Sequence, residues 1–404
     1  MRVLAWNIQW FTLSRIAPEI QPWHQGHADD ADRAFANLRY IKSTVRQADP
    51  DVFVLVEARC TWGPLAELAP GDGPTALGLL LLHLRELSGQ WCLVPPVRIN
   101  PSELEPGYTE TMGVFWRNDR LRFLGPLVWP PNQAGNAPSP TGPAVSPTQP
   151  SAQSYPAPWD WAMPHGANVP LADKVAAACV RFYTPEGQEV FFNQSAFRRP
   201  VLTIFRERAG AQRLIRLITF HLPPNSNAQQ ALANLTDADP IFWQPAANEM
   251  TVLVGDFNLD LNGSVNASAA WDVLTHEHFR LIRPPLIPAP FPVLSRRSPT
   301  TYVSTSTATT DNYRRTACYD YGAVKYGSAP QAIVPAVVAE RVAGVPAAPP
   351  MPGFTYEMAY SLNTIRQIAD EDERTEFFRR RWNYGHIARP SGTSDHLPVF
   401  MVVT

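Results

Sequence analysis

Residues Met250–Asn258, with the sequence MTVLVGDFN, decide how the rest of the chain is interpreted. The first five residues are an apolar run, which predicts a strand covered on both faces. Gly255, Asp256, Phe257 and Asn258 follow where that run ends. Taken alone, such a segment is more often a turn after a strand than part of a catalytic site. The interpretation as part of a catalytic site is supported because other apolar strands of this chain also lead into polar residues.

Three further apolar segments show the same pattern. The segment 2–8 carries Asn7, the run 52–56 leads into Glu57, and the strand predicted over 212–220 leads into His221. Sites in layered α/β folds lie at strand ends, so the recurrence predicts one domain with one site. Further strands are predicted over 91–98, 110–117, 175–183, 189–193, 200–207, 300–303, 316–325 and 397–403, and helices over 29–48, 75–88, 226–237 and 359–382.

Proline is the unusual feature of the composition. The chain has 42 prolines in 404 residues, about twice the ordinary usage. Many of them fall in the segments 126–170, 284–299 and 328–353, between the predicted strands. We therefore expect a single domain over 1–404 that these proline-rich loop insertions enlarge. Proline-rich backbone is already extended, so the insertions are also candidates for docking a protein partner.

Charge, hydropathy and cysteine content narrow the class of protein. The formal net charge is −2, which excludes polyanion binding through bulk positive charge but allows a local basic patch. No apolar run reaches the roughly 20 residues that span a bilayer, and the N-terminal segment lacks the pattern of a signal peptide. The four cysteines form no Cys-x-x-Cys pair, which predicts reduced thiols rather than a zinc site. We expect a cytoplasmic protein without a membrane partner.

The polar residues near strand ends share one kind of chemistry. Carboxylate and amide oxygens suit Mg²⁺, Mn²⁺ or Ca²⁺ and are poor ligands for zinc. Imidazoles exchange protons near neutral pH, and a carboxylate inside a strand is costly unless it is paired. The oxygen donors are Asn7, Glu57, Asp256, Asn258 and Asp395, the imidazoles are His221 and His396, and the carboxylates inside strands are Glu110 and Asp320. This collection suits the attack of water on phosphorus beside a divalent metal ion.

An ordered set of motifs resembles the endonuclease/exonuclease/phosphatase superfamily over residues 2–403. The motifs are Trp6-Asn7-Ile8, Val56-Glu57, Gly255-Asp256-Phe257-Asn258, Tyr319-Asp320-Tyr321 and Ser394-Asp395-His396-Leu397-Pro398. The resemblance implies an α/β fold, a four-layer αββα sandwich of two packed mixed β-sheets. Each motif is weak alone, and their joint occurrence in chain order is specific.

The resemblance also implies roles for individual residues. Glu57 is expected to be the principal metal ligand, with Asn7 and Asp395 close by. Asp256 and Asn258 are expected to position the nucleophilic water and the scissile phosphate. His396, oriented by Asp320, is expected to contact that phosphate.

Within the superfamily, the chain is most similar to deoxyribonuclease I. The segment Ile218-Thr219-Phe220-His221-Leu222-Pro223 is similar to the second histidine motif of that group, and Glu110 stands where its carboxylate partner is expected. Glu57-Ala58-Arg59 resembles a metal ligand followed by an arginine that enters the DNA minor groove. Arg117, seven residues after Glu110, is a second candidate contact to a phosphate backbone.

These observations predict a divalent-metal-dependent phosphodiester hydrolase, with DNA cleavage by an endonuclease as the leading activity and nucleic acid as partner. Mg²⁺ or Mn²⁺ is the expected cofactor, with Ca²⁺ as an alternative. The rival within enzymes is a phosphomonoesterase or a lipid phosphodiesterase of the inositol phosphatase or sphingomyelinase type, because fold and metal chemistry do not choose the substrate. A non-enzymatic binding module is the third reading. The sequence leaves open which histidine is the base.

Overall fold

The computed structural model describes the strands, the helices and the segments close to them. The described residues are 1–17, 28–61, 69–100, 109–125, 198–223, 226–238, 244–260, 271–272, 274–282, 302–303, 316–317, 319–327, 337–338 and 398–403, with single residues at 182, 184, 188, 190, 192 and 396. The proline-rich stretches 126–170 and 284–299 and the helix predicted over 359–382 lie outside this set. The stretch 328–353 also lies outside it, except for residues 337–338.

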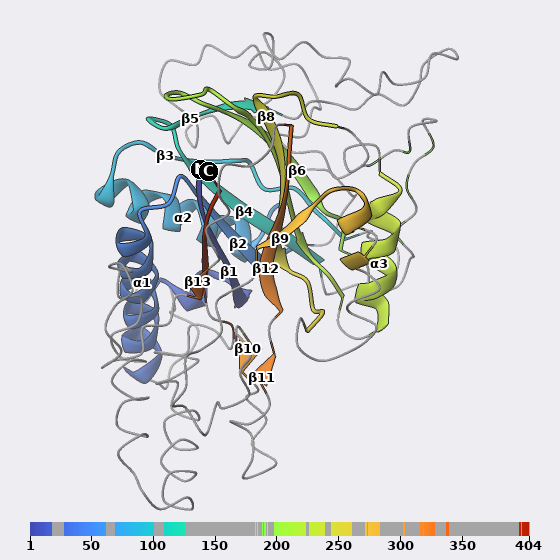
Figure 1. The fold of residues 1–404 in the computed structure, drawn as a ribbon. Coiled ribbons are helices and arrows are strands. Elements are labelled where there is room, and N and C mark those ends of the chain that lie inside the picture. Colours follow the sequence, from blue (N-terminus) through green and yellow to red (C-terminus); the bar gives the residue numbers. More distant parts are fainter. Residues whose placement is uncertain are drawn as a thin grey trace, which may run out of the picture.

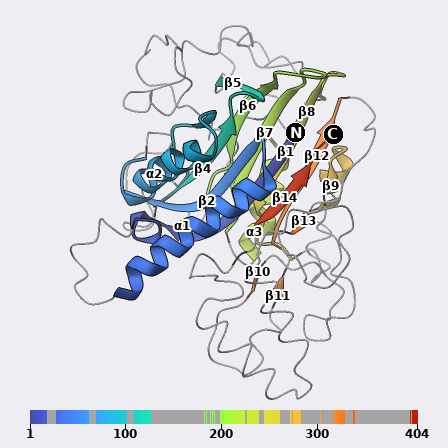
Figure 2. The same cartoon turned by 90° about the vertical axis from the view of Figure 1, so that its left-hand side faces the viewer.

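The first sheet has six strands in the order β13-β14-β1-β2-β4-β3. Their bounds are β1 (Arg2–Phe11), β2 (Val52–Cys60), β3 (Trp91–Leu93), β4 (Thr109–Arg117), β13 (Val337–Val338) and β14 (Val399–Val402). Strands β1 and β2 pair in parallel, and the other neighbours pair antiparallel, so the sheet is mixed. The pairing of β1 with both β2 and β14 brings the two ends of the chain together, as Figures 1 and 2 show.

The second sheet also has six strands, in the order β5-β6-β7-β8-β12-β9. Their bounds are β5 (Leu121–Gly125), β6 (Val201–Glu207), β7 (Leu214–His221), β8 (Glu249–Asp256), β9 (Arg280–Ile282) and β12 (Asp320–Tyr326). Here β7 and β8 form the parallel pair, so this sheet is mixed as well. A separate two-stranded pair joins β10 (Tyr302–Val303) to β11 (Thr316–Ala317).

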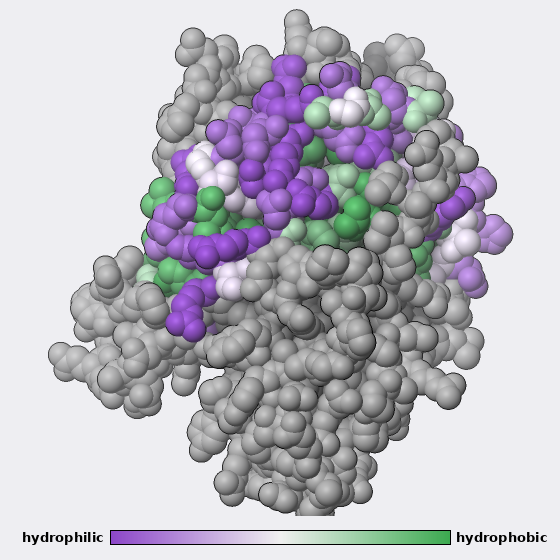
Figure 3. All heavy atoms as spheres, turned by 60° about the vertical axis from the view of Figure 1, so that its left-hand side comes forward, coloured by the Kyte–Doolittle hydropathy of each residue, from purple (hydrophilic) through white to green (hydrophobic). Residues whose placement is uncertain are grey.

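Helices cover the outer faces of the two sheets. Helices α1 (Ala28–Ala48) and α2 (Asp72–Leu87) lie against the first sheet, and α3 (Ser226–Thr236) lies beside the second. Among the described side chains of α1, Leu38, Ile41, Val45 and Ala48 belong to the buried apolar cluster, a helical spacing that places one apolar face against the sheet. Of the described side chains of α1, Arg39 and Arg46 are exposed, and Figure 3 shows much purple on the surface that carries these helices. A short 3₁₀ turn, η1 (Leu13–Arg15), follows β1.

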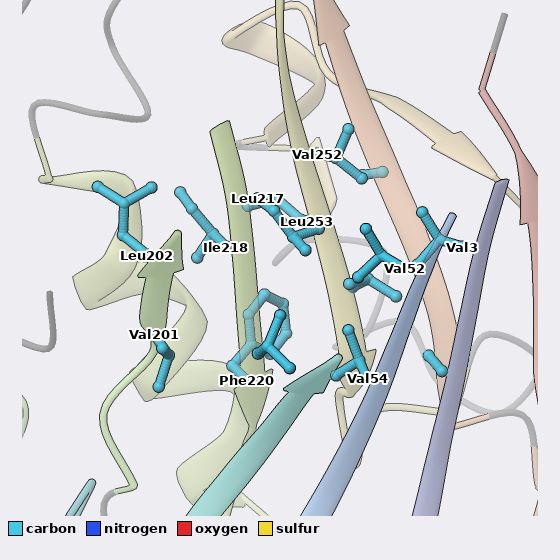
Figure 4. Close-up of a cluster of buried hydrophobic side chains, with 14 of the residues drawn as sticks. Val3, Val52, Val54, Val201, Leu202, Leu217, Ile218, Phe220, Val252 and Leu253 are labelled. Atoms are coloured by element: carbon cyan, nitrogen blue, oxygen red, sulfur yellow. The ribbon is translucent and has the colours of Figure 1, made fainter. Parts of the chain in front are cut away.

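Alternating side chains of the first sheet serve two different cores. In β1, Val3 and Ala5 pack between the sheets, whereas Leu4 and Trp6 pack with the residues of α1 and α2. The inter-sheet core is formed by aliphatic and aromatic side chains of both sheets, shown in Figure 4. Residues labelled there include Val3, Val52 and Val54 from the first sheet and Leu217, Phe220 and Leu253 from the second. The predicted four-layer α/β sandwich is confirmed by these two packed mixed sheets and their helices.

The described residues also bear on the predictions about cysteines and about membrane-spanning segments. Cys60 and Cys92 are free cysteines, and burial raises the pKa of their thiols to about 12 and about 11. Cys179 and Cys318 lie outside the described residues. Of the helices in the described ranges, none is long and apolar enough to cross a membrane.

Candidate active site

The second sheet places three of the predicted site residues in one row. Parallel pairing aligns His221 at the end of β7 with Asp256 at the end of β8. Antiparallel pairing aligns Asp320 at the start of β12 with the same Asp256. Three neighbouring strands therefore present an imidazole and two carboxylates side by side at one edge of the sheet.

The first histidine–carboxylate pair joins the two sheets. Glu110 lies in β4 of the first sheet and is fully buried. Its Oε2 lies 2.9 Å from Nδ1 of His221 in the second sheet. An ionised carboxylate can only accept, so Nδ1–H donates and Nε2 faces the site. The same Oε2 lies 2.7 Å from Nε of Arg198, whose positive charge stabilises the carboxylate.

The second pair has the same construction. Oδ2 of Asp320 lies 2.8 Å from Nδ1 of His396, and both side chains are buried. His396 precedes β14 of the first sheet, so this bond also crosses between sheets. The indole Nε1 of Trp6 donates to the backbone carbonyl of His396 over 2.9 Å. That bond fixes the backbone from which the imidazole projects.

Asp256 lies between the two imidazoles. Its Oδ2 is 3.5 Å from Nε2 of His221 and 3.8 Å from Nε2 of His396. The amide of Asn7 donates to Oδ2 over 2.9 Å, and the backbone N–H of Asn258 donates to Oδ1 over 2.8 Å. Asn258 Nδ2 also donates to the carbonyl of Leu222 over 2.8 Å. These bonds hold the carboxylate of Asp256 in one orientation between the Nε2 atoms.

The local sequence of this segment explains its conformation. Gly255 has φ +148°, and a Cβ there would lie 1.9 Å from the carbonyl oxygen of Phe220 on the neighbouring strand. Only glycine fits this close approach. Asn258 has φ +48°, in the left-handed region that asparagine tolerates better than most residues. The Gly-Asp-Phe-Asn sequence is therefore suited both to the turn and to the site.

Glu57 reaches the site through a β-bulge. We expected the strand to end at this residue, but β2 continues to Cys60, with a shift in its register to β4 between Leu55 and Ala58. Val56 packs between the sheets and Ala58 packs toward the helices, so the bulge resets the alternation around Glu57. Glu57 itself has φ +67°, which is uncommon for a residue other than glycine. Such local strain is typical of functional sites.

The Glu57 carboxyl is buried among the charges of both pairs. Burial raises its pKa, and the Glu110 carboxylate adds to this effect, whereas His221, Arg198 and His396 act in the opposite direction. A bound divalent cation would offset the cost of a buried carboxylate. Asn7 lies next to Glu57, because its register partner on β2 is Val56. A carboxylate beside an amide oxygen fits a hard cation such as Mg²⁺ or Mn²⁺.

A second group could also be considered as a metal site. Ligand atoms of Asp256, Asp320 and His396 all lie within 4.8 Å of one another. The 2.8 Å bond between Oδ2 of Asp320 and Nδ1 of His396 engages two of the ligand atoms of this group. Glu57 and Asn7 offer only oxygen donors, which Mg²⁺ and Mn²⁺ prefer, so the Glu57 side of the site fits such a cation better.

The two arginines predicted to contact substrate, Arg59 and Arg117, lie at opposite ends of the first sheet's strands. Arg59 follows Glu57 by two residues and pairs in register with Glu110, so it lies at the site. Arg117 lies at the opposite end of β4, where it bonds Asp119 over 2.8 and 2.7 Å and Asp49 over 3.3 Å. This position separates Arg117 from the other candidate site residues. Asp395 lies outside the described residues.

Two residues of the site were not assigned a role from the sequence. Arg198 is one of them, since nothing in its local sequence connects it to Glu110, 88 positions earlier in the chain. Trp6 was quoted only as the neighbour of Asn7. Alternation along β1 predicts that its ring faces the helices, but not that its N–H reaches His396.

Together, the sandwich of two mixed sheets and the buried histidine–carboxylate pairs that join them define an α/β sandwich protein with its candidate site where the two sheets meet. The chain belongs to the Endonuclease/Exonuclease/phosphatase family, whose sequence profile matches residues 4–321. Members of this family hydrolyse phosphoesters and generally use divalent metal ions. Among curated proteins, none matches the chain in sequence.

Solved structures similar to the chain include three at low sequence identity. One is TDP2 of D. rerio in complex with a single-strand DNA product, at 10% identity and a TM-score of 0.42, covering 99% of this chain and 97% of the other. A second is a mannosyl-6-phosphatase of Bacteroides thetaiotaomicron, at 10% identity and 0.46, covering 100% and 99%. A third is the human Nocturnin catalytic domain with a bound sulfate, at 12% identity and 0.41, covering 100% and 94%.

Proposed function

We propose that the protein is a divalent-metal-dependent phosphodiester hydrolase that cleaves nucleic acid, with DNA as the first substrate to test. The observation that carries this proposal is the arrangement of two imidazole Nε2 atoms on either side of Asp256, at 3.5 and 3.8 Å from its Oδ2. Each imidazole is oriented through Nδ1 by its own buried carboxylate. Such a pair suits a reaction that needs both the removal and the delivery of a proton.

The residues would divide the work as follows. Glu57 and Asn7 would hold the cation, together with Asp395 as the sequence predicts. When bound, a divalent ion supplies charge neutralisation of the phosphate oxygens. One Nε2 accepts the proton of the attacking water, and the other stabilises or protonates the departing oxygen. Asp256, held by Asn7 and Asn258, orients the water.

Nucleic acid is favoured as the substrate because Arg59 lies beside Glu57 and carries a positive charge at the site. Among the described residues, no carboxylate pairs with this guanidinium, whereas Arg117, Arg120 and Arg213 each bond one. An arginine without a carboxylate partner is available to bind a second phosphate of a polymer.

A substrate panel tests the proposal. Plasmid DNA, RNA, inositol phosphates and sphingomyelin are each incubated with the purified protein in Mg²⁺, in Mn²⁺ and in EDTA. We expect metal-dependent cleavage of DNA, its loss in His396→Ala, and wild-type turnover in His83→Ala. The control histidine lies on the outer helix α2, bonded to Glu86. Phosphatase turnover without nuclease activity would reverse the ranking of substrates, and normal DNA cleavage by His396→Ala would refute the site assignment.

The separate roles of the imidazoles are assigned by pH–rate profiles. A variant that lacks the base loses the limb of the profile that rises with pH, whereas one that lacks the acid loses the limb that falls. His221→Ala and His396→Ala should therefore each remove a different limb.

A further inference from the structure

Trp10 is an exposed aromatic residue at the edge of the candidate site. The residue is 47% exposed, which makes it one of two large hydrophobic residues exposed in the described part of the chain. It lies three residues after Asn7, where the pairing of β1 with β2 shifts register between Asn7 and Phe11. Its φ of +52° is rare for a bulky residue. The irregular backbone turns an indole outward at a position where regular β-structure would have continued.

The guanidinium of Arg59 lies over this indole. The distance from Arg59 Cζ to the ring centroid is 4.9 Å, within the range of a cation–π interaction. The two residues follow Asn7 and Glu57 on neighbouring parallel strands, so both lie next to the expected cation position. The irregularities in β1 and β2 thus produce a metal-binding pair and, just beyond it, a pair of an aromatic ring and an arginine.

A second arginine–tryptophan pair in the same sheet provides a contrast. Arg117 lies over Trp91 at 5.8 Å, but Trp91 is buried and Arg117 is bonded to Asp119. That pair is satisfied within the protein. Trp10 is exposed, and among the described residues Arg59 has no carboxylate partner. The Trp10–Arg59 pair therefore has the composition of a ligand-binding surface.

We propose that Trp10 and Arg59 form a subsite for a single-stranded nucleotide next to the scissile phosphate, in which Trp10 stacks on the base and Arg59 binds the adjoining phosphate. This inference rests on the proposed action on nucleic acid. A flat exposed indole stacks on any nucleobase, since every base has a π-face. The guanidinium lies over the ring and supplies charge for the phosphate. The subsite would favour bases that are not held in a duplex.

Binding without cleavage tests the subsite directly. A fluorescently labelled single-stranded oligonucleotide and the same strand with abasic residues are titrated in EDTA, with anisotropy as the readout. The abasic strand keeps sugar and phosphate but lacks the rings. We expect the wild-type protein to bind the base-containing strand about tenfold more tightly. Trp10→Ala should abolish this preference, and Trp10→Phe should restore most of it.

Two further variants separate stacking from other effects. Leu82→Ala removes the other exposed large hydrophobic side chain, on α2, and should bind both strands as the wild type does. Arg59→Gln should weaken both strands equally and lower the salt dependence of binding by about one phosphate contact. Circular dichroism checks that each variant is folded.

The outcomes distinguish this inference from the proposed function. If the wild-type protein binds both strands equally, or if Trp10→Ala weakens both by the same factor, the stacking subsite is refuted even where DNA is cleaved. The second result would assign Trp10 only to positioning Arg59. A base preference that depends on Trp10, found together with no nuclease activity, would support the subsite and refute the proposed cleavage of nucleic acid.

Discussion

Asp320→Asn tests whether a histidine–carboxylate pair works as a unit. The bond between Asp320 and His396 is 2.8 Å long and buried, which is the range of a charge-assisted hydrogen bond. An amide has nearly the same shape and can still accept through its oxygen, but it lacks the charge that stabilises an imidazolium. Bonds to charged groups contribute roughly 1.5–3 kcal/mol, so we expect the rate to fall about 10- to 150-fold.

A double-mutant cycle gives the sharper result. His396→Ala alone removes the imidazole and should cost about 10²- to 10⁴-fold in rate. If Asp320 acts only through His396, the double variant should be no slower than His396→Ala. The assay is hydrolysis of a chromogenic phosphodiester under saturating metal, with unfolding curves to confirm that each variant is folded. Multiplication of the two single effects would refute the reasoning, because Asp320 would then act independently of the imidazole.

The remaining predictions concern charges in and away from the site. Mg²⁺ should raise the melting temperature of the wild-type protein but not that of Glu57→Gln. Calorimetry with and without metal measures both temperatures, and an equal rise in both would exclude Glu57 as a ligand. Arg117→Gln should keep full activity and lose about 1 kcal/mol of stability in urea, since its ion pairs are partly exposed. Glu110→Gln should lower activity and also destabilise by about 3 kcal/mol, because Arg198 would lose its buried counter-charge. Glu207→Gln should destabilise by about 1–2 kcal/mol at pH 7, with the difference from wild type shrinking as the pH falls below 4.5.

The sign of the last prediction follows from the environment of Glu207. Burial acts to raise the pKa of its carboxyl, but hydrogen bonds from Arg213 at 2.9 and 2.6 Å lower it overall. A carboxyl whose pKa is lowered by folding stabilises the folded state at pH values above its ordinary pKa. This stabilisation is lost as the pH falls and the carboxyl is protonated. Glutamine has no such charge, so the two proteins should converge at low pH. A constant difference across the pH range would contradict this explanation.

The sequence predicted the elements that carry the site, because apolar runs are the strongest local signal of buried strands. The predicted segments at Asn7, Glu57, His221 and Asp256 all correspond to described strands, and the structure brings these residues together. What the sequence could not supply is the exact path of the backbone. The bulge at Glu57 adds one residue without any proline or glycine to mark it, so a regular strand end was the natural prediction.

The separation of Arg117 from the site has a simple geometric cause. A strand rises about 3.3 Å per residue, so seven residues separate Arg117 from Glu110 by roughly 23 Å. The odd interval also turns the two side chains to opposite faces of the sheet. Applied strictly, strand geometry would have excluded a shared site. Arg198 is the converse case, because its contact with Glu110 depends on the docking of two sheets and leaves no local trace.

The hydrogen bonds of the site explain why the two sheets must pack as they do. Asn7 with Asp256, Glu110 with His221, and His396 with Asp320 each join one residue of the first sheet or its entry to one of the second. Neither sheet alone holds an oriented imidazole. The positions of both Nε2 atoms therefore depend on the inter-sheet spacing, which the apolar core between the sheets sets. A core substitution far from the site should thus affect catalysis by moving one partner of each pair relative to the other, even where no site residue is changed.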